Sequence, residues 1–181
     1  HCALVMSFDS ILPVLSREEL GASDGSIYGY LIMGFGAGSF LGLLLIAGVR
    51  DDARKGQVLI WTALASGLTP VMLAFSGTVP MALLASAAMG ASQATFMALT
   101  NTYVQTIAPD RLRGRISSLY TLHAGGVMAF SNLGYGFMAD VFSAPHVLLV
   151  TAVVFVAFLA ALIVGQPVLR KVYRTGQVVA A

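Results

Sequence analysis

Cysteine and histidine are scarce in this chain of 181 residues. Cys2 is the single cysteine, so no internal disulfide bond can form. The three histidines stand far apart, and no Cys/His spacing typical of a metal site occurs. This scarcity excludes a disulfide-stapled fold and predicts neither a metal site nor a bound cofactor.

Charged residues are also few. They make up 10% of the chain, whereas 57% of the residues are hydrophobic. A water-soluble domain of this length would have too little polar surface to cover its exterior, but a lipid bilayer removes that problem. The composition therefore predicts a membrane protein with the lipid bilayer as a partner. The net charge of +2 gives no support for a nucleic-acid partner.

Signatures of membrane enzymes are missing. An intramembrane aspartyl protease needs a G-x-G-D sequence, but Asp140 follows Phe137, Met138 and Ala139. A rhomboid-type serine protease needs G-x-S-G, which the chain also lacks. The sequence therefore predicts that the protein is not an enzyme.

Long apolar runs are what the sequence does contain. At ~1.5 Å per residue, a helix of about 20 residues crosses the ~30 Å hydrocarbon layer of a bilayer. The fold class predicted is an all-α transmembrane bundle. Its membrane helices are expected at residues 27–49, 57–75, 81–107, 116–141 and 147–169, followed by a tail at 170–181.

The first fifteen residues are apolar but too few to cross a bilayer. We interpret residues 1–15 as the outer part of a helix whose inner end is missing. The chain opens on His1, and no basic residue precedes Arg17, so a signal peptide is not predicted. We therefore expect a fragment of a longer membrane protein.

Basic residues lie almost entirely at one end of the predicted helices. If the helices alternate in direction, nine of the ten Lys and Arg residues share that end. They fall in residues 50–56, 109–115 and 170–181, and only Arg17 lies opposite. The positive-inside rule makes the basic end cytoplasmic, including the carboxyl terminus.

Small residues repeat at four-residue intervals within two of the predicted helices. Gly34, Gly38 and Gly42 form such a stripe in one helix, and Gly90 belongs to a similar stripe in another. A stripe without side chains lets a second helix approach closely, so these glycines predict helix packing. A nucleotide-binding loop is disfavoured, because the G-x-G-x-x-G spacing fails and no strand precedes the glycines.

A polar stripe follows the helix expected at 81–107. It consists of Gln93, Met97, Asn101 and Gln105. Carboxamides in hydrocarbon need partners, so this stripe should face a neighbouring helix or a water-filled cavity. It indicates either hydrogen bonds that hold the bundle together or the lining of a transport pathway.

Two ionisable residues within membrane depth are further pathway candidates. Asp9 could accept a proton or pair with a cation, or its carboxylate could reach water or Arg17. His123 could relay protons, or it could be a neutral histidine that is hydrogen-bonded to a neighbouring helix.

The connection at residues 109–115 carries a longer motif. Together with residues 116–120 it reads P-D-R-L-R-G-R-I-S-S-L-Y. This sequence resembles the P-x-x-x-R-G-R-x-x-S-L-Y connection between helices ten and eleven of major facilitator superfamily exporters. The closest branch looks like the bacterial drug and siderophore efflux group that includes the enterobactin exporter. The resemblance covers the whole chain in helix order, from a broken helix seven to helix twelve.

The resemblance implies the carboxy-terminal six-helix half of a secondary transporter in the bacterial inner membrane. Such a protein would work by alternating access as a proton-coupled antiporter that exports a drug-like or siderophore-like small molecule. Its partners would be the missing amino-terminal half, the substrate and protons. A major facilitator importer, a non-transporting membrane scaffold and a channel subunit are the alternatives.

The same motif supplies four candidate residues at the cytoplasmic end: Arg111, Arg113, Gly114 and Arg115. The arginines could determine the topology alone. Alternatively, they could also hold an inward gate closed through contacts with acidic groups or helix ends.

The charge asymmetry gives a prediction about topology. A fluorescent protein fused after Ala181 should mature and fluoresce, because the positive-inside rule places this end in the cytoplasm. An alkaline phosphatase fused at the same position should be inactive. High phosphatase activity would reverse the assigned orientation.

Overall fold

The computed structural model describes residues 1–21, 25–49 and 51–175. Every regular element within these residues is a helix, which confirms the all-α prediction. The long helices are α2 (Ser26–Ala47), α3 (Asp52–Ala74), α4 (Val79–Ile107), α5 (Arg113–Val141) and α6 (Ala144–Gly165). The short ones are α1 (Leu12–Glu18), the 3-10 turn η1 (Asp110–Leu112) and α7 (Pro167–Thr175).

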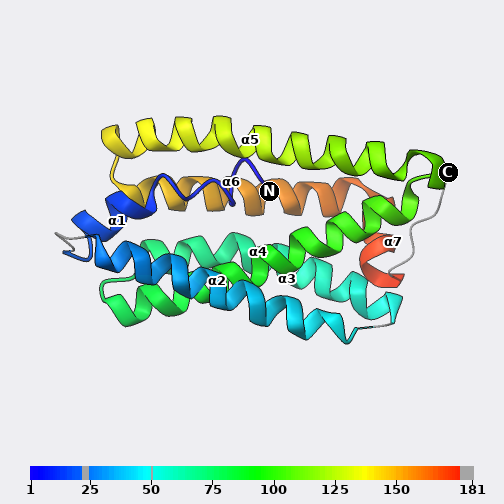
Figure 1. Ribbon diagram of the computed structural model, residues 1–181, viewed down its shortest axis with the longest axis horizontal. Coiled ribbons are helices and arrows are strands. Elements are labelled where there is room, and N and C mark those ends of the chain that lie inside the picture. The colour runs from blue at the N-terminus through cyan, green and yellow to red at the C-terminus, as the bar shows by residue number, and fades with distance from the viewer. Residues whose placement is uncertain (22–24, 50, 176–181) are drawn as a thin grey trace.

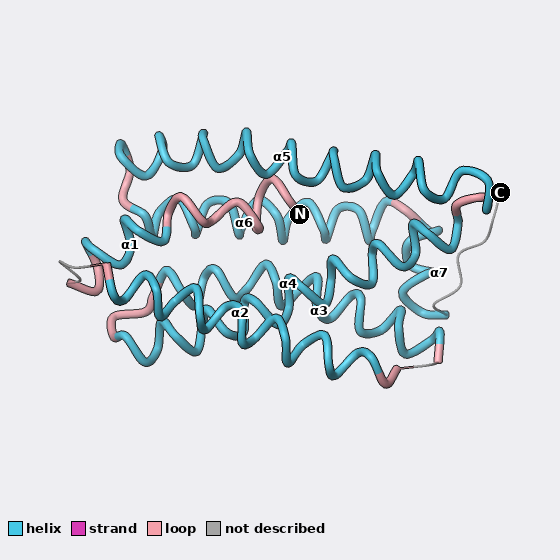
Figure 2. Tube along the Cα trace, viewed as in Figure 1, coloured by secondary structure: helices cyan, strands magenta, loops and turns pink. Residues whose placement is uncertain are grey.

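The long helices lie side by side, and their connections alternate between the two ends of the bundle (Figures 1 and 2). Helices α2, α3 and α4 form one side, and α5 and α6 run along the other. Helix α7 lies at the end where α3 and α5 begin. Arg50 and residues 176–181, which the sequence assigns to this basic end, lie outside the described residues.

Within the described residues, four helices are long and apolar enough to cross a membrane: α2, α3, α4 and α6. Helix α5 has 29 residues, as many as α4 and more than the other three, but is not among them. It carries polar residues such as His123 and Asn132, which lower its hydropathy. The span expected at 116–141 therefore exists as a helix, beside α6, but is less apolar than the sequence interpretation assumed.

The structure corrects the helix expected at residues 1–15. Residues 1–11 form turns and irregular backbone, and the helix runs only from Leu12 to Glu18. Pro13 lies in the first turn of α1, where its missing N–H costs little. In a helix that continued from upstream, the same proline would leave the carbonyl of Asp9 without its donor.

The single helix expected at residues 147–169 is also corrected, because the structure has two helices there. Helix α6 ends at Gly165 and α7 begins at Pro167. Pro167 cannot donate to the carbonyl of Ile163 four residues earlier, so the helix breaks. The tail expected from residue 170 continues as helix to Thr175.

Helix α3 begins five residues earlier than the expected start at residue 57. Asp51 explains the difference, because its Oδ1 accepts a hydrogen bond from the N–H of Ala53 at 3.1 Å. An aspartate at this position satisfies a free backbone donor of the first turn and so stabilises an earlier helix start.

Helices α2 and α4 approach each other at backbone distance. A Cβ added to Gly38 would collide with the carbonyl of Ala87, and one added to Gly90 would collide with that of Phe35. At Gly42 the added atom would lie 2.6 Å from the carbonyl oxygen of Ala91. These positions admit only glycine unless the helices move apart.

Gly34 lies at a looser end of the same contact, where an added Cβ would meet the carbonyl oxygen of Leu83 at 3.3 Å. Near it, Ser86 of α4 donates a hydrogen bond of 2.6 Å to the carbonyl of Leu31 in α2. The contact between α2 and α4 therefore combines small residues with a buried interhelical hydrogen bond.

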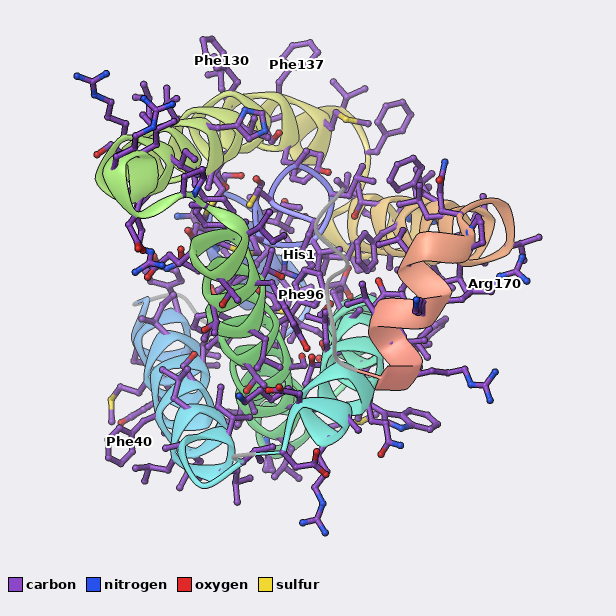
Figure 3. All side chains as sticks on the ribbon, turned by 90° about the vertical axis from the view of Figure 1, so that its right-hand side faces the viewer. His1, Phe40, Phe96, Phe130, Phe137 and Arg170 are labelled. Atoms are coloured by element: carbon purple, nitrogen blue, oxygen red, sulfur yellow. The ribbon has the colours of Figure 1, made fainter. Side chains whose placement is uncertain are left out.

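Residues 1–11 fill the interior between α4, α5 and α6 (Figure 3). Val5 packs in a cluster with Phe155 of α6, and Ser7 donates to the carbonyl of Met128 in α5 at 3.4 Å. Phe8 lies against Phe35 of α2, with ring centroids 5.0 Å apart. This segment therefore supplies much of the core.

Large apolar side chains cover the outside of the bundle. Phe40 of α2 and Phe130 and Phe137 of α5 point away from it and are 63%, 81% and 72% exposed (Figure 3). Side chains of this kind are stable when lipid tails surround them and would be unfavourable in water.

The α2–α4 contact yields a prediction with a control in the same helix. Gly38→Ala should destabilise the full-length protein by about 1–3 kcal/mol, because the added methyl group forces the two backbones apart. Gly36→Ala should be neutral or stabilising, since a Cβ there meets nothing within 4 Å and alanine favours helix. The melting temperature of each variant is measured in detergent, with size-exclusion chromatography used to monitor the loss of folded protein. Equal melting temperatures would contradict the packing role of Gly38.

Candidate functional site

The polar stripe of α4 begins with Gln93, whose side chain is fully buried. Its Nε2 donates a hydrogen bond to the carbonyl oxygen of Val5 at 3.2 Å. Its Oε1 has no hydrogen-bond partner among the described residues. Gln93 therefore ties α4 to residues 1–11 and keeps one buried acceptor available.

Met97 continues the stripe one turn further along α4. Its sulfur lies 3.9 Å from Sγ of Cys2 and 3.6 Å from the hydroxyl of Tyr120 in α5. A thioether is a weak acceptor, so these contacts mainly bring residues 1–11, α4 and α5 together around one side chain.

Asn101 lies in a groove of about 360 Å³ between α4 and α5. Its half-buried amide accepts a hydrogen bond of 3.3 Å from Nε2 of Gln105. The groove offers amide, hydroxyl and thioether groups, while small residues leave room for a ligand. Its lining is Met97, Ala98, Asn101, Tyr120, Thr121, Ala124 and Gly125.

Gln105 also connects the stripe to the arginine-rich connection. Its backbone carbonyl accepts a hydrogen bond of 3.1 Å from Nε of Arg113. Arg113 forms an ion pair with Asp110 as well, with 2.8 Å between Nη2 and Oδ1. The guanidinium thus binds a free carbonyl at the end of α4, where the helix dipole favours a positive charge.

The other residues of the connection extend into solvent. Arg111, Gly114 and Arg115 are exposed, and a Cβ at Gly114 would meet nothing within 4 Å. Neither Arg111 nor Arg115 has an ion pair or hydrogen bond with another described residue.

Asp9 and His123 do not join the polar stripe. Both side chains are exposed, and neither makes a hydrogen bond or ion pair with the described part of the chain. Asp9 lies in the turns before α1, and His123 lies on α5. The stripe residues are therefore clustered, whereas these two ionisable residues stand apart.

The sequence interpretation missed the polar residues of α5. Tyr120 and Thr121 line the groove opposite Asn101. Asn132 accepts from the N–H of Ser10 at 3.4 Å, and Tyr135 donates to the carbonyl of Ala3 at 2.6 Å. Their recurrence on one face of a helix was the signal that could have identified them.

No group of three or more His, Cys, Asp or Glu residues is placed to hold a metal ion within residues 1–21, 25–49 and 51–175. The site consists of uncharged polar groups between α4 and α5, with a cationic connection at one end. Such an arrangement can hydrogen-bond a small molecule.

Comparison with known proteins identifies the family. The model of the family MFS_3, described as transmembrane secretion effector, matches residues 2–176. No curated protein and no solved structure matches the chain. The family match includes α4, α5 and the arginine-rich connection between them. The chain therefore belongs to the transmembrane secretion effector family and is a multi-pass membrane protein of the major facilitator type of transporter.

Proposed function

We propose that this chain is the carboxy-terminal half of a transporter that exports a small molecule by alternating access. The observation that carries the proposal is the polar groove between α4 and α5, in a bundle whose outer surface is apolar. The family description, which refers to secretion, supports outward movement. The missing six-helix half would supply the other wall of the pathway.

The chemistry of the groove favours an uncharged or weakly charged substrate of mixed polarity. Asn101 and Thr121 offer hydrogen-bonding groups, and Met97 and Ala124 offer apolar contact area. Among the residues that the structure describes, no acidic or basic side chain lines this groove. A drug-like or siderophore-like molecule fits this chemistry better than a small inorganic ion does.

Protons are the coupling ion in this proposal. Asp9 is the carboxylate we propose for proton exchange, because its exposed side chain lies in a turn and not in the packed core. A carboxylate that alternates between water and a less polar environment would bind and release a proton as its exposure changes.

The basic end of the bundle faces the cytoplasm of a bacterial cell in this proposal. The described arginines at the starts of α3 and α5 and along α7 all lie at that end. Their common location agrees with the positive-inside rule.

The groove predicts a binding effect for Asn101→Ala. Loss of one neutral hydrogen bond, about 0.5–1.5 kcal/mol, should raise the apparent KM for efflux by roughly 2- to 10-fold. The KM is measured from the efflux of fluorescent amphiphilic dyes out of proteoliposomes that contain the full-length protein. Ser118→Ala is the control, because its exposed hydroxyl bonds only the carbonyl of Gly114 in its own helix. Equal KM values in both variants would show that Asn101 does not contribute to substrate binding.

Proton coupling predicts a different result for Asp9→Asn. The variant should lose most of the acceleration that an imposed pH gradient gives to efflux, because asparagine cannot exchange a proton. Its KM should change little. Wild-type dependence of the efflux rate on the pH gradient would show that Asp9 does not couple transport to protons.

A further inference from the structure

Helix α7 divides its side chains between a basic face and an apolar face. Pro167, Arg170, Lys171 and Arg174 lie at the i, i+3, i+4 and i+7 positions of one face and line a depression of about 250 Å³. Val172 lies on the opposite side of α7 and is 9% exposed, and the half-buried Tyr173 lies between the two sides. Burial also raises the pKa of the Tyr173 phenol above its ordinary value. Val172 is therefore packed against protein, whereas the side chains of Arg170 and Arg174 are exposed.

Contacts with α3 and α6 hold α7 in this orientation. Arg170 donates from Nε to the carbonyl oxygen of Ile163 at 2.6 Å and from Nη2 to that of Val164. These carbonyls belong to the last turn of α6, where the helix has no donors of its own. A guanidinium carries five N–H groups, so Arg170 keeps donors for a further acceptor.

Helix α3 contacts α7, and the two aspartates at its start are already in ion pairs. Asp51 lies 3.8 Å from Arg54, and Asp52 lies 3.0 Å from Lys55, each in an ion pair within the first turns of α3. No described acidic residue lines the depression of α7. Arg174 and the remaining donors of Arg170 therefore present a positive surface to an external anion.

The location of the basic face restricts which anion it meets. Helix α7 follows α6, an apolar span, after the single residue Gln166. The face is therefore at the depth where a membrane helix leaves the hydrocarbon layer. Figure 3 views the bundle along its length and shows Arg170 at the outer edge, where lipid headgroups would surround the protein.

We propose that the basic face of α7 binds the phosphate groups of anionic phospholipids in the cytoplasmic leaflet. The occupant is a headgroup, because the cations lie laterally at the end of a membrane span and the lipid phosphates lie at that same depth. Binding would anchor α7 and, through the Arg170 contacts, fix the end of α6.

The test uses the full-length protein in nanodiscs of phosphatidylcholine and phosphatidylglycerol. A photoactivatable phosphatidylglycerol probe should label residues around α7 several-fold more than the matching phosphatidylcholine probe, as mapped by mass spectrometry of peptides. Arg174→Gln should reduce this labelling by about fivefold, the effect expected for one basic residue near an anionic surface. This variant leaves the contacts of Arg170 with α6 intact.

Arg115→Gln is the matched control. It removes one exposed arginine from the same end of the bundle and breaks no hydrogen bond or ion pair among the described residues. Labelling of α7 should stay at the wild-type level in this variant. Equal losses in both variants would indicate general surface charge and overturn a site on α7, as would equal labelling by the two probes. Loss of labelling with millimolar inorganic phosphate, at constant ionic strength, would instead identify a site for soluble phosphate.

Discussion

The close contact between α2 and α4 is the constraint on which the rest of the bundle depends. Gly38 and Gly90 meet the backbone carbonyls of the opposite helix, so neither helix can rotate or slide without a collision. In lipid, helices gain little free energy by burying apolar surface against each other, because lipid is apolar too. Close packing and interhelical hydrogen bonds stabilise the association instead. Because this contact fixes one face of α4, it also fixes where the polar stripe of the same helix points.

The orientation of α4 explains why the polar groups of the bundle gather between α4 and α5. Gln93 and Met97 reach residues 1–11 and α5, and Asn101 opens into the groove. Hydrocarbon cannot satisfy these groups, so they must face protein or a water-filled space. The outer faces of α2 and α5 carry Phe40 and Phe130 instead. Polar groups inside and aromatic groups outside are the arrangement expected of a helical bundle in lipid.

Sequence reasoning located the long helices because each is a long apolar run that few turn-forming residues interrupt. It failed where one backbone group decided the outcome. Pro167 ends α6 because it has no N–H to donate. Asp51 starts α3 early because its side chain accepts a hydrogen bond from the N–H of Ala53. The turns at residues 1–11 were also missed, since apolar composition there fits a packed irregular segment as well as a helix. Of the site, the stripe on α4 could be predicted from its spacing. The polar residues of α5, Tyr120 among them, also recur on one face, but only the structure shows that this face lies against α4.

The break at Pro167 has a consequence for the end of the bundle. Proline frees the carbonyl of Ile163, and Arg170 three residues later supplies the missing donor. Arg113 plays the corresponding role at the end of α4, where it binds the carbonyl of Gln105. In both places a cation meets the negative end of a helix dipole and a free carbonyl together. The arginines on which the proposed orientation rests therefore also satisfy backbone groups that the bilayer could not.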